Sequence, residues 1–186
     1  MEQPALRDPA PAPLDLVQDL VNTVDLEGGD EAWGTPEDLA AWLRARGIGA
    51  GPVDAGTLAG ALELREALRE VCAAHAGADV PAEALRGVNA LLAAAPLRLE
   101  ADAAGGAAVR PAEGLAGLAA LTAEVAAAVA AGVAAGTWPR LKACAAESCR
   151  WVYYDRSPAG RGRWCTMAIC GSREKMRGYR RRRAGA

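Results

Sequence analysis

The sequence predicts a mainly α-helical protein with a small β-hairpin, followed by a compact cysteine-containing module at the carboxyl end. Apolar residues recur at helical spacing through much of the first half of the chain. Hydrophobic residues make up 52% of the 186, Phe is absent and Ala and Leu dominate, which favours closely packed helices over a β-sandwich. Four of the five cysteines fall between residues 144 and 170. This length suits one ordinary domain and a small module.

The amino-terminal region begins with a predicted flexible arm and a first helix. Residues 1–13 contain four prolines and no apolar periodicity, so we expect them to be a flexible arm. The helix begins at Leu14 and ends at Asn22-Thr23, before the break at Gly28-Gly29. Its apolar face is formed by Leu16, Val17, Leu20, Val21 and Val24.

Three further helices are predicted before residue 95. Thr35-Pro36-Glu37-Asp38 combines an N-cap, a first-turn proline and an acidic residue three positions after the cap. Gly47 is expected to end that helix, whose apolar face holds Leu39, Trp42 and Leu43. Longer amphipathic helices are expected over 58–75 and 81–94.

The periodicity changes after Pro96. Residues 97–110 alternate apolar and polar around Gly105-Gly106, which predicts a β-hairpin. An Ala-rich helix follows over 113–135, and we place the boundary between a helical regulatory domain, 14–138, and the terminal module, 139–186, at Pro139. Thr122 and Glu124 interrupt the Ala-rich run, so no transmembrane segment is predicted. Because the first residues also lack a signal-peptide pattern, we expect a soluble cytoplasmic protein.

The terminal cysteines form two close pairs, Cys144-x4-Cys149 and Cys165-x4-Cys170. Four thiolates in two such pairs suit a soft tetrahedral cation, most commonly zinc. Four protein ligands leave no position for substrate, so the ion is expected to be structural. The alternatives are two disulfides, redox chemistry or unrelated free thiols; the missing signal peptide argues against disulfides.

The module around these cysteines is expected to be a hairpin followed by a helix. Trp151 to Tyr154 is the predicted first strand, the run SPAGRGR its loop, and Trp164 to Met167 the returning strand. Cys170-Gly171 then lets the backbone wrap the metal, and residues 174–183 continue as a helix. By analogy this arrangement is treble-clef-like.

The module resembles the CGNR-type zinc finger, a family of bacterial transcription regulators. The resemblance rests on the cysteine pairs, on Arg163-Trp164-Cys165, and on Cys170-Gly171-Ser172-Arg173 with Lys175 and the terminal arginines. Tyr153, Asp155 and Ser157 match its aromatic-x-Asp-x-Ser segment. Ser172 stands where the family has Asn, and Tyr153 where Phe is usual. Ser172 is expected to cap the last helix as Asn would.

The preceding region resembles the helical ABATE-like domain that accompanies such fingers, a region described as a stress-induced transcription regulator. The matching pieces are short: Asp19 to Thr23, Thr35 to Leu39, Trp42-Leu43, Leu64 to Leu68, and Asn89. The two resemblances together cover nearly the whole chain.

Charge is divided unequally along the chain, which has a net charge of −2. Residues 140–186 hold 13 Lys and Arg against 3 Asp and Glu, whereas residues 1–139 hold 8 against 20. This asymmetry predicts a nucleic-acid-facing end on an acidic body. The candidate contacts are Arg161, Arg163, Arg173, Lys175, Arg177, Arg180, Arg181, Arg182 and Arg183, of which Arg173, Arg177 and Arg180 should share one helix face.

DNA is therefore the expected partner. The alternatives are an RNA-binding accessory factor, and a ligand-sensing or protein-docking module whose zinc is purely structural. The helical domain is expected to sense a small-molecule effector of unknown identity, or to form a homodimer.

No enzyme is predicted. Cys72 and His75 are spaced like a nucleophile and a base, but a buried thiol beside a partly exposed imidazole is the more ordinary arrangement. Asp155 is expected to orient Arg163 or a backbone amide of the hairpin. The five tryptophans are expected to pack in the core or between the domains.

Overall fold

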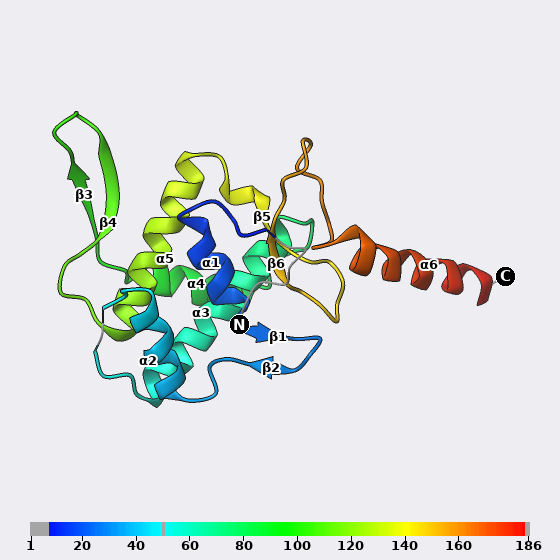
Figure 1. Cartoon of the computed structure of the whole chain (residues 1–186), viewed down its shortest axis with the longest axis horizontal. Coiled ribbons are helices and arrows are strands. Elements are labelled where there is room, and N and C mark those ends of the chain that lie inside the picture. The colour runs from blue at the N-terminus through cyan, green and yellow to red at the C-terminus, as the bar shows by residue number, and fades with distance from the viewer. Residues whose placement is uncertain (1–7, 50, 185–186) are drawn as a thin grey trace.

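The computed structural model describes residues 8–49 and 51–184 and contains six α-helices in that part of the chain. Helices α1 to α5 gather into one body, and α6 extends away from it at the carboxyl end (Figure 1). The helices are α1 Leu14–Val21, α2 Pro36–Ala45, α3 Ala55–Ala74, α4 Ala82–Ala93, α5 Gly117–Ala134 and α6 Ser172–Ala184.

The described strands form three separate antiparallel pairs. They are β1 Val24–Asp25 with β2 Asp30–Glu31, β3 Leu97–Ala101 with β4 Ala107–Pro111, and β5 Leu141–Ala143 with β6 Val152–Tyr154. The hairpin predicted near 97–110 is confirmed, with Leu99 opposite Val109. Strands β1 and β2, which flank the Gly28-Gly29 break, were not predicted from the sequence.

The start of α2 follows the sequence prediction closely. Thr35 Oγ1 accepts a hydrogen bond from the Asp38 amide at 3.3 Å, and Asp38 Oδ2 accepts one from the Thr35 amide at 2.9 Å. This is a complete capping box with Pro36 in the first turn. Gly47, at φ 66°, follows the helix in a conformation that favours glycine.

Helix α3 begins three residues earlier than expected because of its cap. Asp54 Oδ1 accepts from the Thr57 amide at 2.7 Å, so Ala55 and Gly56 join the helix despite contributing little to the apolar pattern.

Helix α5 packs against α1, α3 and α4 and also contacts β4. Leu121 and Val125 are fully buried, and small residues let neighbouring helices approach closely. At Gly132 a side chain would meet Leu14 of α1, because an added Cβ would lie 2.8 Å from Leu14 Cδ2. By length and composition α5 could cross a membrane, but half of its residues are buried within the protein. In this fold it is a core helix.

The hydrophobic core continues past the predicted domain boundary. Leu141, Ala143 and Val152 of the β5–β6 pair are buried in the same cluster as the residues of α1 and α3. The terminal module is therefore packed on the helical body and shares its core.

The described part of the predicted flexible arm also packs on the body. Ala10 is buried, and its amide donates to Gln18 Oε1 at 2.5 Å. Arg156 donates to the Pro9 carbonyl at 2.7 Å. Residues 8–13 are thus held by α1 and the terminal module, whereas residues 1–7 lie outside the described residues.

Candidate metal centre and basic helix

The first cysteine pair lies in the connection between β5 and β6. The Cys144 amide donates to Trp151 O at 2.9 Å and so extends the strand pair by one step. The chain then turns, with the amides of Cys149 and Arg150 both donating to Ala146 O, and Arg150 adopts a positive φ of 48°. This tight turn brings both sulfurs to one side.

The prediction for the second strand of this hairpin was wrong. Strand β6 pairs with β5, which precedes it, and Lys142 lies opposite Tyr153. Residues 164 and 165 form a bend, and Met167–Gly171 is a π-helical turn that runs directly into α6. The partner of β6 is therefore Leu141–Ala143, the segment before the first cysteine, which packs in the core with α1 and α3.

The second cysteine pair is held by the bend and by the π-helical turn. Cys170 lies in that turn and is fully buried. The expected N-cap at Ser172 was also wrong: Ser172 has helical φ and ψ, and its Oγ donates back to Met167 O at 3.0 Å. Helix α6 thus continues the metal-binding turn and needs no separate start.

The four sulfurs converge on one point. The Sγ atoms of Cys144, Cys149, Cys165 and Cys170 all lie within 4.8 Å of one another. Cys149 Sγ is 3.7 Å from Cys165 Sγ, which is 3.6 Å from Cys170 Sγ. A tetrahedral zinc ion with Zn–S bonds of about 2.3 Å requires sulfurs about 3.8 Å apart. The residues fit the ion, and they form one structural zinc site.

The electrostatics of the cluster also call for a cation. Hydrogen bonds with Cys149 and Cys165 lower the pKa of Cys144, and hydrogen bonds with Cys144 and Cys149 raise the pKa of Cys165. Burial, followed by repulsion from Cys144 and Cys149, raises the pKa of Cys170. Four thiolates this close repel one another unless a divalent ion lies between them. Trp151, Tyr153 and Trp164 surround the sulfurs with apolar surface.

A buried ion pair holds the loop that joins the two cysteine pairs. Lys142 Nζ lies 2.9 Å from Asp155 Oδ2, and both side chains are 4% exposed. Asp155 also accepts from the amides of Ser157, at 3.0 Å, and Gly162, at 2.7 Å. Although burial alone would raise it, these hydrogen bonds and Lys142 hold the pKa of Asp155 below its usual value. Of the two roles expected for Asp155, the structure shows the orientation of backbone amides. Among the described residues, Arg163 is not a partner of Asp155.

The predicted nucleic-acid contacts lie on α6 and on the loop before it. Arg173, Arg177 and Arg180 border one shallow hollow together with Ile169 and Met176, so the three arginines do share a face. Arg173 pairs with Glu27 in the turn between β1 and β2, and Arg177 pairs with Glu174 at 2.8 Å.

The other candidate cations are exposed. Lys175, Arg180, Arg181 and Arg182 make no ion pair with any described residue, and Arg183 donates to Tyr179 Oη at 3.4 Å. Arg161 and Arg163 are exposed in the loop before Cys165. The guanidinium of Arg163 lies 5.7 Å from the Trp164 ring centroid, which is a cation–π contact.

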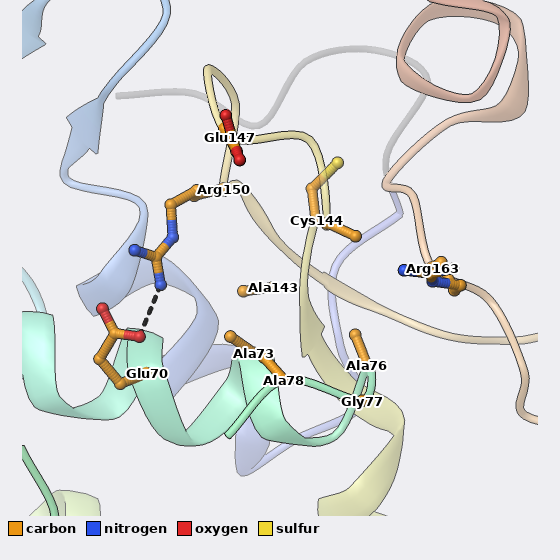
Figure 2. Close-up of a pocket in the computed structure, with 11 residues that line it drawn as sticks. Glu70, Ala73, Ala76, Gly77, Ala78, Ala143, Cys144, Glu147, Arg150 and Arg163 are labelled. Carbon is orange, nitrogen blue, oxygen red and sulfur yellow. Dashed lines mark hydrogen bonds and ion pairs between the residues drawn. The ribbon is translucent and has the colours of Figure 1, made fainter. Parts of the chain in front are cut away.

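A cavity of about 460 Å³ separates the end of α3 from the first cysteine turn. Figure 2 shows Arg150 reaching across to Glu70 on one side of the cavity and Arg163 on the opposite side. Arg150 Nη2 is 2.8 Å from Glu70 Oε2. The remaining lining includes Cys144, Ala143, Ala76 and Gly77, so the cavity touches both a metal ligand and the helical body.

Three polar side chains that the sequence analysis did not single out join the helices to the finger. Asn22, at the end of α1, exchanges two hydrogen bonds with the backbone of Val152, and Gln18 adds a third to Val152 O at 3.3 Å. Arg69 of α3 is 1% exposed and donates to Val21 O and to Arg150 O. Polar residues among the apolar positions of α1 and α3 were the available signal.

Cys72 is buried in the main hydrophobic core, and His75 contacts the start of the terminal module. Burial raises the pKa of Cys72 to about 12. His75 Nδ1 lies 2.8 Å from Leu141 O, and its ring packs edge-on to Trp138. The imidazole therefore secures the start of β5.

Comparison with known proteins gives two family matches. Residues 140–183 match the CGNR zinc finger. Residues 14–136 match the ABATE family, described as "putative stress-induced transcription regulator". A search of curated proteins finds no match.

Proposed function

Since this chain belongs to the ABATE family and ends in a CGNR zinc finger, we propose that it regulates transcription by binding DNA through α6 and the loop before it. The proposal places the protein in the cytoplasm and, from the family description, in a response to stress. The helical body would position the finger and receive the regulatory signal.

The observation that carries this proposal is the exposure of the cations on α6. The helix has seven Lys and Arg residues and one Glu, and it extends away from the acidic body (Figure 1). Guanidinium groups bind phosphate oxygens and guanine edges with two hydrogen bonds each. A cationic helix whose side chains are exposed to solvent along its length can enter a DNA groove.

The metal site supports the proposal because it fixes the base of this helix. Cys170 is the last zinc ligand, and α6 begins two residues later at Ser172. When zinc is bound, the four sulfurs hold it in a closed shell, which fixes the π-helical turn and the direction of α6. The ion has a structural role in this proposal.

The arginines divide into two groups with different tasks. Arg173, Arg177 and Arg180 share one face and would approach base edges together with Met176. Arg181, Arg182 and Arg183 follow around the helix and would contact phosphates. Arg161 and Arg163 on the loop would contact a second stretch of backbone.

Fluorescence anisotropy of the zinc-loaded chain with duplex DNA tests the proposal. Engaging five to seven phosphates makes log K fall by roughly 4.5 to 6 per decade of salt. Arg181→Ala with Arg182→Ala should reduce that slope by about 1.8. Arg44→Ala with Arg86→Ala removes the same charge from exposed positions on α2 and α4 and should leave the slope unchanged.

The proposal fails if the chain binds no duplex DNA at low salt. It also fails if the Arg181/Arg182 variant and the Arg44/Arg86 variant weaken DNA binding equally. Salt-dependent binding to single-stranded RNA, without such binding to duplex DNA, would favour an RNA-binding accessory factor.

Effector sensing at the cavity beside Cys144 is a second candidate function. Its volume of about 460 Å³ falls within the range of small-molecule sites, and it joins the helical body to the finger. Arg163 makes no ion pair with the described residues and would bind a carboxylate or phosphate group. Titration calorimetry with small organic acids and phosphate esters, repeated on Arg163→Gln, tests this. If the substitution leaves the binding heat unchanged, the ligand does not bind in this cavity.

A further inference from the structure

Strand β3 has a free edge on the outer side of its hairpin. The β3–β4 hairpin projects from the body at the end opposite α6, and β4 lies between β3 and α5 (Figure 1). Among the described residues, β4 is the only strand that pairs with β3. The outer edge therefore presents unpaired backbone groups.

The register shows which backbone groups point outward. The Ala112 amide donates to Pro96 O, and the Asp102 amide donates to Gly106 O, both at 2.9 Å. Because hydrogen-bonded pairs alternate along an antiparallel ladder, even-numbered residues of β3 face β4. The amides and carbonyls of Leu97, Leu99 and Ala101 thus point away from β4.

The side chains on this strand are unusual for an exposed edge. Leu99 is 74% exposed and Leu97 is 40% exposed. Charged residues and prolines normally protect such an edge from other strands. Arg98 and Glu100 are the charged residues here, and they carry opposite signs.

These two charges make the edge complementary to itself. If a second β3 pairs antiparallel with Leu99 opposite Leu99, Leu97 lies opposite Ala101 and Arg98 lies opposite Glu100, twice by symmetry. This register also brings together the outward backbone groups of residues 97, 99 and 101. Opposite charges directly across a strand pair are stabilising, and like charges are destabilising.

We propose that two copies of this chain associate through β3, forming a four-stranded sheet around a two-fold axis at Leu99. The interface is isologous, since each copy supplies the same residues. Strand β4 is less suited to the role because Pro111 lacks an amide hydrogen and because α5 lies beside it. The inference rests on the hairpin alone and does not depend on DNA binding.

Neighbouring charges do not block the pairing. Arg98 Nη1 lies 2.7 Å from Glu113 Oε1, but the Glu113 side chain is 80% exposed and can exchange partners with water. Glu100 approaches Arg98 only at 3.9 Å, and its side chain is 55% exposed. Both residues are available to a second strand.

Sedimentation velocity of the zinc-loaded full chain over a range of concentrations, without DNA, tests the proposal. The wild type should show a monomer–dimer equilibrium. Arg98→Glu and Glu100→Arg should each raise the dissociation constant by roughly tenfold or more, because two symmetric attractions become repulsions.

Mixing the two single variants gives the decisive result. In a mixed pair every Glu faces an Arg, so the mixture should dimerise although neither variant does so alone. The double variant Arg98→Glu with Glu100→Arg should also dimerise, which shows that the substitutions leave the fold intact. Arg86→Glu makes the same change of charge at an exposed position on α4, away from the hairpin, and should leave the dimer unchanged.

A wild type that stays monomeric at every concentration overturns the proposal. So does a dimer that persists in both single variants, or a mixture of these variants that fails to associate. Association only with other proteins would assign the edge to a different partner and equally contradict a homodimer.

Discussion

The side-chain amide of Asn22 makes the two hydrogen bonds to Val152 that a neighbouring strand would otherwise make. Val152 N donates to Asn22 Oδ1 at 2.8 Å, and Asn22 Nδ2 donates to Val152 O at 2.7 Å. These residues are 130 positions apart in the chain, and both are buried. The end of α1 therefore completes the edge of β6.

Replacing Asn22 by Ala should destabilise the zinc-loaded protein by about 2–3 kcal/mol, because it leaves the amide of Val152 buried without a partner and its carbonyl with only the longer hydrogen bond from Gln18. Urea unfolding followed by Trp fluorescence measures this. Asn89→Ala removes an exposed Asn from α4 and should change the free energy of unfolding by less than about 0.5 kcal/mol. If the two substitutions lower the free energy of unfolding equally, the hydrogen bonds between Asn22 and Val152 make no specific contribution to stability.

Zinc content should follow the four clustered cysteines and not Cys72. Elemental analysis should give one zinc per wild-type chain and a large loss for Cys149→Ser or Cys170→Ser, whereas Cys72→Ala should retain the metal. Zinc contributes roughly 10–16 kcal/mol of apparent free energy in finger peptides, so its loss should also unfold the terminal module. Full zinc occupancy in Cys170→Ser would contradict the four-sulfur site.

His75 should make stability depend on pH near neutrality. Burial lowers the pKa of His75 below its ordinary 6.5, against the opposing effect of its hydrogen bond to Leu141. Below 6.5 the unfolded chain therefore binds more protons than the folded one, and stability falls as pH falls.

His75→Gln removes this dependence, since His75 is the only histidine in the chain. The difference in unfolding free energy between wild type and variant should be constant above pH 6.5 and shrink below it. Acid loss of zinc affects both proteins alike and cancels in the difference. A difference that stays constant through this range would refute the assignment.

Asp155→Asn should destabilise the finger by about 3 kcal/mol, because Lys142 would remain buried without a counter-charge. The carbonyls of Gly160 and Gly162 still accept from Lys142 and limit the loss. Because the pKa of Asp155 is lowered, its stabilising effect is present above about 3.8 and disappears as the pH falls further. Denaturant titration checks this, with Asp79→Asn in an exposed loop as the comparison.

Glu27→Gln should strengthen DNA binding several-fold at low salt. Glu27 is the acidic partner of Arg173, so the substitution frees that guanidinium for a phosphate. Glu37→Gln makes the same change of charge on α2 and reports the general effect of a less acidic body. Anisotropy titrations that give identical affinities for the two variants would mean that Arg173 lies outside the DNA contact.

Local signals in the sequence predicted much of the fold. The Thr35 cap, the Gly105-Gly106 hairpin and the four cysteines each depend on residues close together in the chain, and all three predictions are confirmed. The choice of partner for β6 depends instead on packing against α1 and α3. Leu141-Lys142-Ala143 is too short to carry a strand pattern, so its pairing could not be read from the sequence.

The residues that join the finger to the body were hidden for a related reason. Asn22 resembles an ordinary helix end, and Arg69, three residues before Cys72, is a polar residue within the apolar face of α3 whose partner the sequence does not name. Only the folded arrangement shows that both lie against backbone from the terminal module.

Because Leu141, Ala143 and Val152 belong to the core of the helical body, the finger cannot be moved to another protein as an independent module. Excised at Pro139, it would carry an apolar surface shaped to fit α1 and α3, and the severed body would expose the matching surface. Chimeras that graft this finger onto another regulator would need the docking faces of both helices to travel with it.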